Sequence, residues 1–584
     1  MALQGSGGRE GSMTQKHVEE PPLSATNREQ ATVQWQPVST RAIQACVLAF
    51  VLCILVMIAP LHRFSGTTLL LQLPTNILLL PWGTWLPSDL HLTPSHRASQ
   101  LTTNIIEFLL LMALAFMIYG ICALLIQRKP AQGNHSVTFR SIWLGAIVTG
   151  LIFVLAPAMP SHDIFAYAGY GRIIAAHHAN PYFVPLAAFP QDPFNAIDDW
   201  RYASAAYGPL WLAICALWAF VLGNNPLHYI IVFRLFAFAC HLLNIWLVSA
   251  TLRAMGRSPR TIASGTLLYA WNPLVVFESC LGGHNDILML TCMLTGIFLS
   301  VRAEQRGFAS PRSYLAPTIA FTLTALIKFT TLPLIVFFLV LLARKTLFTD
   351  QSAPLTYQQP DSLQRRPALL AVLIASTSSA GMALILYMPF WIGHSMQDIV
   401  SSFSTPPSAR FAFKSILHGI VAWNTAHSLP TNPVAHTLLS VFGSHSAWNA
   451  INIAAFVVEL LVGAIYVWRV PTTHSIAFAT LATLSTLLVL TPWFFPWYLI
   501  WIVGLAAVCL PMDHFRIGRG LLAFTLTFSA SSLLTYLFNG YPPMGGWIGL
   551  ICLTTIGPPL AAFFVSLLLP NAASRALPEN AVDT

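Results

Sequence analysis

The residues best suited to chemistry lie between Ser161 and Pro185, directly after a long apolar segment. This stretch, SHDIFAYAGYGRIIAAHHANPYFVP, contains one acidic residue, Asp163, in a chain of which only 8% is charged. If the stretch is helical, Asp163, Tyr167 and Tyr170 share one side at positions i, i+4 and i+7. A carboxylate on such a stripe can act as a general base at a membrane surface. The alternative is an ordinary helix cap beside an aromatic belt.

The loop that continues to about residue 208 is more polar and aromatic than a connector needs. His162 precedes the carboxylate, and Arg172 and the turn Asn180-Pro181-Tyr182 follow it. We therefore predict that residues of about 160 to 208 form a catalytic loop that contains interfacial helices. The candidate substrate contacts in this loop are His162, Tyr167, Arg172, Asn180 and Tyr182.

A second polar group follows the glycine pair Gly282-Gly283. The glycines predict the end of one helix, and Asn285 or Asp286 can cap the next. Capping does not account for His284, nor for Glu278, because ionisable side chains at membrane depth are functional candidates. His284, Asn285 and Asp286 are therefore candidate residues for positioning a substrate.

Basic residues near apolar segments are candidate phosphate-binding groups. Lys328 lies at the tip of a hairpin of two short apolar runs, where it either snorkels to the surface or meets an anion. Arg234 lies about two turns inside an apolar segment, and Arg410 and Lys414 lie on a long loop. These last three also fit the alternative of ordinary interface anchors.

The aromatic segment from Thr491 to Tyr498 admits two interpretations. Its sequence, TPWFFPWY, is typical of an aromatic belt at a membrane interface. Stacked aromatic rings also bind sugars, because the C–H faces of a pyranose are apolar. We retain Trp497 and Tyr498 as candidate sugar-binding residues and interpret the others as belt residues.

Composition indicates the fold class. The 584 residues are 56% hydrophobic and 12% aromatic, and apolar runs recur along the whole chain. These features predict an all-α, polytopic membrane protein and exclude a soluble one. The nine cysteines show no metal-binding spacing, and no GxGxxG, Walker or HExxH motif occurs. The net charge of +9 is scattered over loops, so nucleic acid is not an expected partner.

Hydropathy divides the chain into three parts. Residues 1–42 predict a disordered cytosolic tail, residues 43–570 a single transmembrane domain, and residues 571–584 a C-terminal tail. We expect roughly 13 to 15 membrane-spanning helices, with the catalytic loop after the third of them.

The distribution of Arg and Lys predicts the orientation. If the basic clusters are cytoplasmic, the chain from Pro160 to Leu252 crosses the membrane an odd number of times. The simplest solution makes the short run 209–223 interfacial or re-entrant. This orientation places Asp163, His284 and the aromatic segment on the extracytoplasmic face of the cell membrane.

Together these motifs resemble the GT-C class of integral-membrane glycosyltransferases. The chain is similar in particular to bacterial polyprenol-phosphomannose-dependent mannosyltransferases and to glycosyltransferase family 87. Many members carry paired acids where this chain has one aspartate. The resemblance covers roughly residues 140 to 500 and depends on the joint order of His162-Asp163, Tyr167, Asn180-Pro181-Tyr182, Tyr207-Gly208-Pro209-Leu210-Trp211, Trp271-Asn272-Pro273, Gly283-His284-Asn285-Asp286, Lys328 and Pro496-Trp497-Tyr498.

The resemblance implies a reaction. The donor would be a sugar on a polyprenyl phosphate, with mannose indicated by the resemblance alone, and the acceptor a glycan or glycolipid at the extracytoplasmic face. Asp163 would take the proton of the acceptor hydroxyl as that oxygen attacks the anomeric carbon, with inversion. Lys328, with Arg234 or Arg410 as second choices, would stabilise the departing phosphate.

Other interpretations stay open. We expect no cofactor, although a divalent metal held by Asp163, His284 and Asp286 is an alternative. A lipid or glycolipid transporter or flippase would use Asp163, Lys328 and His284 as gating or proton-coupled groups, but no clear inverted repeat is visible. A polysaccharide polymerase or ligase would need a larger loop that is rich in arginine.

Overall fold

The computed structural model describes most of the transmembrane part of the chain. The described residues are 40–65, 94–130, 132, 134–308, 310–348, 361–402, 413–426, 432–512, 515–538 and 548–569. Within these ranges the secondary structure is helical, apart from a single bridge between Phe413 and Trp493. Residues 1–39 of the tail predicted at 1–42, the tail predicted at 571–584, and Arg410 lie outside the described residues, whereas residues 40–42 belong to the first helix, Thr40–Ser65.

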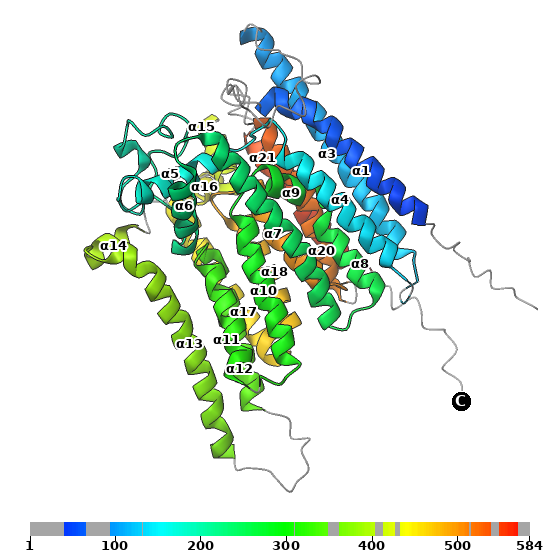
Figure 1. Ribbon diagram of the computed structural model, residues 1–584, viewed down its shortest axis with the longest axis vertical. Coiled ribbons are helices and arrows are strands. Elements are labelled where there is room, and N and C mark those ends of the chain that lie inside the picture. The colour runs from blue at the N-terminus through cyan, green and yellow to red at the C-terminus, as the bar shows by residue number, and fades with distance from the viewer. Residues whose placement is uncertain are drawn as a thin grey trace, which may run out of the picture. The chain divides into compact units, whose positions relative to one another are not determined.

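Ten helical segments of the described chain are long and apolar enough to cross a membrane. They are formed by α1 (Thr40–Ser65), α3 (Pro94–Gln127), α4 (Ser136–Val154), α7 (Pro226–Ala254), α10 (Asp286–Glu304), η3 (Phe329–Thr331) with α12 (Leu332–Leu347), α13 (Asp361–Trp391), α17 (His445–Arg469), α18 (Thr473–Leu490), and α20 (Arg516–Ser531) with η7 (Ser532–Phe538) (Figure 1). The predicted all-α, polytopic membrane protein is confirmed.

Shorter helices complete the described fold and explain why fewer segments than expected reach full length. They are α5 (Asp163–Ala175), η1 (Leu186–Ala188), α6 (Pro209–Leu222), α8 (Pro259–Ala270), α9 (Pro273–Val276), η2 (Phe277–Leu281), α11 (Pro311–Ala325), α14 (Met396–Ser402), α15 (Ile416–Ala426), α16 (Pro433–Phe442), η6 (Pro496–Tyr498) and α19 (Leu499–Val508). The last helix, α21 (Ile548–Leu568), has 21 residues and contains the shorter apolar segment Leu553–Leu568.

The apolar run at residues 261–279, one of the segments counted as a membrane span from hydropathy, is broken in the structure. Pro273 has no backbone N–H to donate, so α8 ends before it, and the side chain of Asn272 caps α9 by accepting from the Val275 N–H at 3.3 Å. A π-helical turn, η2, follows and carries Glu278. Such turns are rare and frequent at functional sites.

The hairpin predicted around Lys328 is confirmed. α11 is short, with 15 residues, whereas η3 and α12 together reach 19 residues, and Lys328 lies in extended conformation between them, with φ −145° and ψ 127°. The turn pairs with the neighbouring loop, because the N–H groups of Gly208 and Leu210 donate to the carbonyls of Ile327 and Leu326 at 2.9 and 3.2 Å.

Arg234 joins the end of α4 to the start of α7. Its guanidinium is fully buried and donates to the carbonyls of Leu281, Val154, Ala156 and Ala158. The end of α4 and the start of α7 therefore lie at the same end of the helical bundle. Between them the chain forms α5, a loop, and α6, which packs against α5 (Figure 1).

Candidate active site

A cavity of about 270 Å³ is lined by residues of α5, the following loop, the Lys328 turn and the aromatic segment before α19. Asp163 and Lys328 are its charged lining residues among those described. The aromatic lining residues are Tyr170, Trp200, Tyr207, Phe329, Trp493, Phe495, Trp497, Tyr498 and Trp501. A carboxylate, an ammonium group and apolar ring faces thus share one space.

Asp163 is the first residue of α5, so the predicted helix after the third apolar run is confirmed. Its side chain is 9% exposed. Oδ1 accepts a hydrogen bond of 3.3 Å from the indole Nε1 of Trp200, and Oδ2 lies 3.4 Å from Nδ1 of His284. The carboxylate is therefore oriented from two sides while it remains part of the cavity lining.

The glycine pair before His284 allows the chain to fold back on itself. Gly283 has a φ of +63°, a conformation that favours glycine, and a Cβ on Gly282 would overlap the imidazole of His284. The helix end predicted here is confirmed, and α10 begins at Asp286. The turn directs the His284 ring toward Glu278 on one side and Asp163 on the other.

His284 is buried between two carboxylates. Nδ1 lies 3.4 Å from Asp163 Oδ2, and Nε2 lies 3.4 Å from Glu278 Oε2. Trp497 stacks on the ring with centroids 3.9 Å apart and planes at 13°. Burial alone would lower the pKa of His284, but the two neighbouring carboxylates, Asp163 and Glu278, raise it to about 9. A protonated ring in this place also gains from the facing indole.

Lys328 is fixed by Asp286 and by aromatic rings. Nζ lies 2.7 Å from Asp286 Oδ1, which also accepts a 2.7 Å hydrogen bond from Nε1 of Trp501. The ammonium group lies 4.7 Å from the ring centroid of Tyr498 and 5.6 Å from that of Tyr207. An ammonium group has three donors, so Lys328 can pair with Asp286 and still meet an anion in the cavity.

The predicted positioning residues form a layer behind the lining. His284, Asn285 and Asp286 are each at most 1% exposed and are not cavity-lining residues. Asn285 Oδ1 accepts from the Tyr167 hydroxyl at 3.5 Å, while His284 and Asp286 contact Asp163 and Lys328. Trp497 and Tyr498, by contrast, lie in the cavity wall as predicted.

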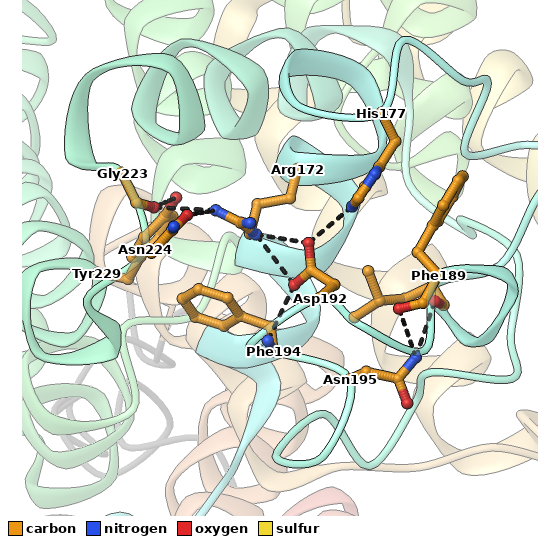
Figure 2. Close-up of polar contacts among 10 residues, drawn as sticks. Arg172, His177, Phe189, Asp192, Phe194, Asn195, Gly223, Asn224 and Tyr229 are labelled. Atoms are coloured by element: carbon orange, nitrogen blue, oxygen red, sulfur yellow. Dashed lines mark hydrogen bonds and ion pairs between the residues drawn. The ribbon is translucent and has the colours of Figure 1, made fainter.

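Arg172 is not brought to the cavity. Its Nε donates to both carboxylate oxygens of Asp192, at 2.8 and 3.0 Å, and its Nη1 donates to the Gly223 carbonyl and the Asn224 side chain (Figure 2). His177 Nε2 lies 2.7 Å from the same carboxylate. This cluster fastens the end of α5 to the loop and to the turn after α6.

The remaining loop candidates also have structural partners. Asn180 donates to the Phe390 carbonyl at 2.6 Å, and the Tyr182 hydroxyl donates to the Tyr207 carbonyl at 2.9 Å, which ties the loop to α13 and to the cavity rim. His162 Nδ1 lies 2.9 Å from Asp199 Oδ2 near the surface. Arg234 is likewise occupied by backbone carbonyls, away from the lining residues.

Several residues at this site were not among the sequence candidates. Trp200, Tyr207 and Trp501 line the cavity, and Asp198 lies buried beneath it, where burial raises its pKa to about 7. The sequence offered a signal for two of them, since Tyr207 lies in the motif that carried the resemblance and Asp198 precedes Asp199 and a tryptophan in a loop with few other charges.

The alternative of a metal held by Asp163, His284 and Asp286 finds no matching geometry among the described residues. His284 turns one nitrogen to Asp163 and the other to Glu278, and Asp286 pairs with Lys328. Within the same part of the chain, no group of three or more His, Cys, Asp or Glu side chains has a geometry that would hold a metal ion.

The fold and the cavity define a class: a polytopic helical membrane protein with a carboxylate and a cation facing an aromatic-lined space. Residues 77–344 match a family described as alpha-(1->6)-mannopyranosyltransferase, N-terminal domain. This region contains Asp163, His284, Asp286 and Lys328. The resemblance to a mannosyltransferase of this class is confirmed, and the match lends weight to the membrane glycosyltransferase interpretation of the motifs.

Curated relatives point the same way over shorter stretches. The chain is 31% identical over 156 residues to an alpha-(1->6)-mannopyranosyltransferase of Mycobacterium tuberculosis, a match covering 26% of each chain. It is 29% identical over 197 residues to a probable alpha-(1->6)-mannopyranosyltransferase of Mycolicibacterium smegmatis, covering 33% of each. It is 25% identical over 185 residues to alpha-(1->6)-mannopyranosyltransferase A of Corynebacterium glutamicum, covering 32% of this chain and 36% of the relative. The chain thus matches well under half the length of each relative.

Proposed function

We propose that this protein transfers mannose from a polyprenyl-phosphate donor to a hydroxyl of a glycan or glycolipid acceptor, with inversion, at the extracytoplasmic face of the membrane. The observation that carries the proposal is the cavity that Asp163 and Lys328 line together. The names of the relatives support mannose as the sugar. The donor type and the face of the membrane come from the sequence argument alone.

The reaction needs a base and a cation at opposite ends of the reacting bonds. Asp163 takes the proton of the acceptor hydroxyl as its oxygen forms a bond to the anomeric carbon. The bond from that carbon to the phosphate oxygen breaks, and the electron pair leaves with the lipid phosphate. Lys328 stabilises the negative charge that develops on this phosphate. In a site shielded from water this electrostatic stabilisation is stronger than in solution.

The aromatic lining suits a sugar between these two charges. Trp497 is stacked on both sides, by His284 at 3.9 Å and by Phe495 at 4.2 Å, so it offers a sugar only its edge. Tyr498 and Trp501 are stacked at 5.0 Å with planes at 21°. Flat rings such as these two pack against the apolar C–H side of a pyranose and leave its hydroxyls free to hydrogen bond. Leu487 and Leu488 of α18 extend the lining with apolar surface, which suits the first part of a lipid chain.

Product formation by the purified protein tests the proposal. Wild type is incubated with polyprenyl phosphomannose and a short mannan or glycolipid acceptor, and the mannosylated product is identified by mass spectrometry. We expect product from this donor and none from a nucleotide sugar. Absence of product with every polyprenyl phosphosugar, together with movement of the lipid across proteoliposomes, would instead support a flippase and contradict the transferase.

A further inference from the structure

Glu278 is an ionisable side chain that lies behind the cavity rather than in its wall. It is fully buried in the π-helical turn η2. Oε1 accepts a 2.8 Å hydrogen bond from the Tyr536 hydroxyl of η7, and Oε2 faces Nε2 of His284 at 3.4 Å. Within the described residues, Glu278 Oε2 and both ring nitrogens of His284 have no hydrogen-bond partner, so these 3.4 Å contacts are their nearest polar ones. A buried carboxylate held in this way costs stability unless a cation compensates it.

The cluster balances its charge only when His284 is protonated. Asp163 and Glu278 contribute two negative charges. Lys414 is another cation near them: it follows Phe413, which bridges to Trp493, it has a φ of +49°, and its ammonium group is 5.7 Å from the ring of Phe495 and 5.9 Å from that of Tyr536. Burial lowers the pKa of Lys414 to about 8, although the charges of Glu278 and Asp163 oppose the shift.

The protonation state of His284 also decides how many carboxylates it can orient. An imidazolium donates from both nitrogens, whereas a neutral ring donates from one. Each nitrogen of His284 faces a different carboxylate, and Trp497 restricts rotation of the ring by stacking on it. Loss of the proton therefore leaves either Asp163 or Glu278 without its donor.

We propose that Glu278 is a positioning residue for the transfer: acting through His284, it keeps the imidazole doubly protonated and so fixes the orientation of the Asp163 carboxylate. This inference rests on the proposed function, and it gives the reaction a chain of three side chains, Glu278, His284 and Asp163, of which Asp163 alone is in the cavity lining. Tyr536 holds the far end of that chain.

The pH dependence of transfer by the full chain tests this role. The turnover number and the KM for polyprenyl phosphomannose are measured across the neutral and alkaline range for wild type, Glu278→Gln and Glu278→Asp. We expect wild type to lose activity on the alkaline side as His284 loses its proton. In Glu278→Gln one of the two carboxylates that stabilise the imidazolium is gone, so this limb moves to lower pH by about one unit or more.

The rates separate positioning from binding. Glu278→Gln is expected to lower the turnover number by about 10- to 100-fold, as loss of an orienting partner typically does, with little change in the KM for the donor. Glu278→Asp keeps the charge, so it should retain the alkaline limb and recover part of the rate, and it carries the test by itself if Glu278→Gln does not fold. Equal loss of rate in both variants, or a wild-type limb in Glu278→Gln, would overturn the inference.

Two controls identify the groups involved. Glu459 is a glutamate of α17 that accepts a 3.0 Å hydrogen bond from Thr486 and has no contact with the cluster, so Glu459→Gln should keep the wild-type profile. In Lys414→Met the alkaline limb should persist, and its disappearance would assign the limb to the lysine and overturn the inference. Absence of product from wild type and Glu459→Gln alike would instead overturn the proposed function.

Discussion

Two histidine–carboxylate clusters of this protein differ in how completely their polar atoms are paired. The carboxylate of Asp192 accepts hydrogen bonds at both oxygens from Nε of Arg172 and one of 2.9 Å from the Phe194 N–H, and it lies 2.7 Å from Nε2 of His177 (Figure 2). Around His284, each ring nitrogen is 3.4 Å from a carboxylate oxygen and makes no hydrogen bond within the described chain.

The two clusters contain the same residue types, and they differ in what separates a structural ion-pair cluster from a reactive site. The Asp192 cluster satisfies its charge internally, lies outside the cavity lining, and joins α5 to the turn after α6. The His284 cluster holds unsatisfied buried groups next to a cavity, an arrangement that costs stability and is found where a substrate or a proton supplies the missing partner. Residue type and proximity in sequence do not separate the two; the pairing does.

Replacing the cavity cation should have the largest effect. Lys328→Met removes the charge that faces the leaving phosphate, and we expect transfer to fall by about 10²- to 10³-fold, the range seen when one stabilising donor is lost. The assay is the rate of mannosylated product at saturating acceptor. The matched control is Lys345→Met, because Lys345 forms a partly exposed pair with Glu304 at 3.3 Å, away from the cavity. Similar losses in both variants would remove Lys328 from the mechanism.

A substitution in the Asp192 cluster should change the stability of the protein and not its transfer rate. Arg172→Met leaves the fully buried Asp192 carboxylate without its guanidinium, and breaking a buried pair in this way typically costs about 3–5 kcal/mol. We expect a lower midpoint of thermal unfolding in detergent and an unchanged transfer rate per folded molecule. A variant with wild-type stability and a lost donor affinity would mean that Arg172 binds substrate, as its place in the loop first suggested.

Asp198 should give the smallest effect, visible in how stability depends on pH. Burial and the charge of Asp163 raise its pKa to about 7, so the folded state binds a proton that the unfolded chain releases at lower pH. This contribution is complete in acid and is lost as the pH rises toward about 7. Asparagine does not ionise, so Asp198→Asn should not lose this stability as the pH rises. Its side-chain oxygen can still accept the hydrogen bond that the Trp200 backbone N–H donates to Asp198 Oδ1 at 2.8 Å.

The measurement is the unfolding midpoint of wild type and Asp198→Asn over the acidic to neutral range. The midpoint difference in favour of the variant should grow up to about pH 7 and stay constant above it, and we expect it to reach only about 2 °C. A difference that does not vary with pH would show that Asp198 is not protonated in the folded protein.

Much of this fold follows from local sequence. The hydropathy pattern predicted the helices, and the hairpin around Lys328 followed from two apolar runs too short to cross comfortably. The break at Asn272-Pro273 was missed because most of the surrounding residues are apolar, although Pro273 was a local signal for it. Hydropathy reports how apolar a segment is, and it does not respond to the one backbone N–H that Pro273 lacks.

The sequence predicted which residues belong to the site, but not which of them line the cavity and which lie elsewhere. Asp163, Lys328, Trp497 and Tyr498 were found from unusual polarity and aromatic content, and all four line the cavity. The same criteria could not tell Arg172 from a substrate ligand, since its partner Asp192 is 20 residues further along the loop. Long-range partners decide whether a polar residue is satisfied, and one sequence does not reveal them.

The central claim is that transfer takes place at Asp163 and not at Asp192, another buried carboxylate of the loop region. The most direct test compares Asp163→Asn with Asp192→Asn at equal amounts of folded protein, with initial rates of mannosyl transfer as the readout. We predict a loss of about 10²- to 10⁴-fold in Asp163→Asn, as expected when a general base is removed, and a wild-type rate in Asp192→Asn. Full activity in Asp163→Asn, or equal losses in both variants, would contradict the account.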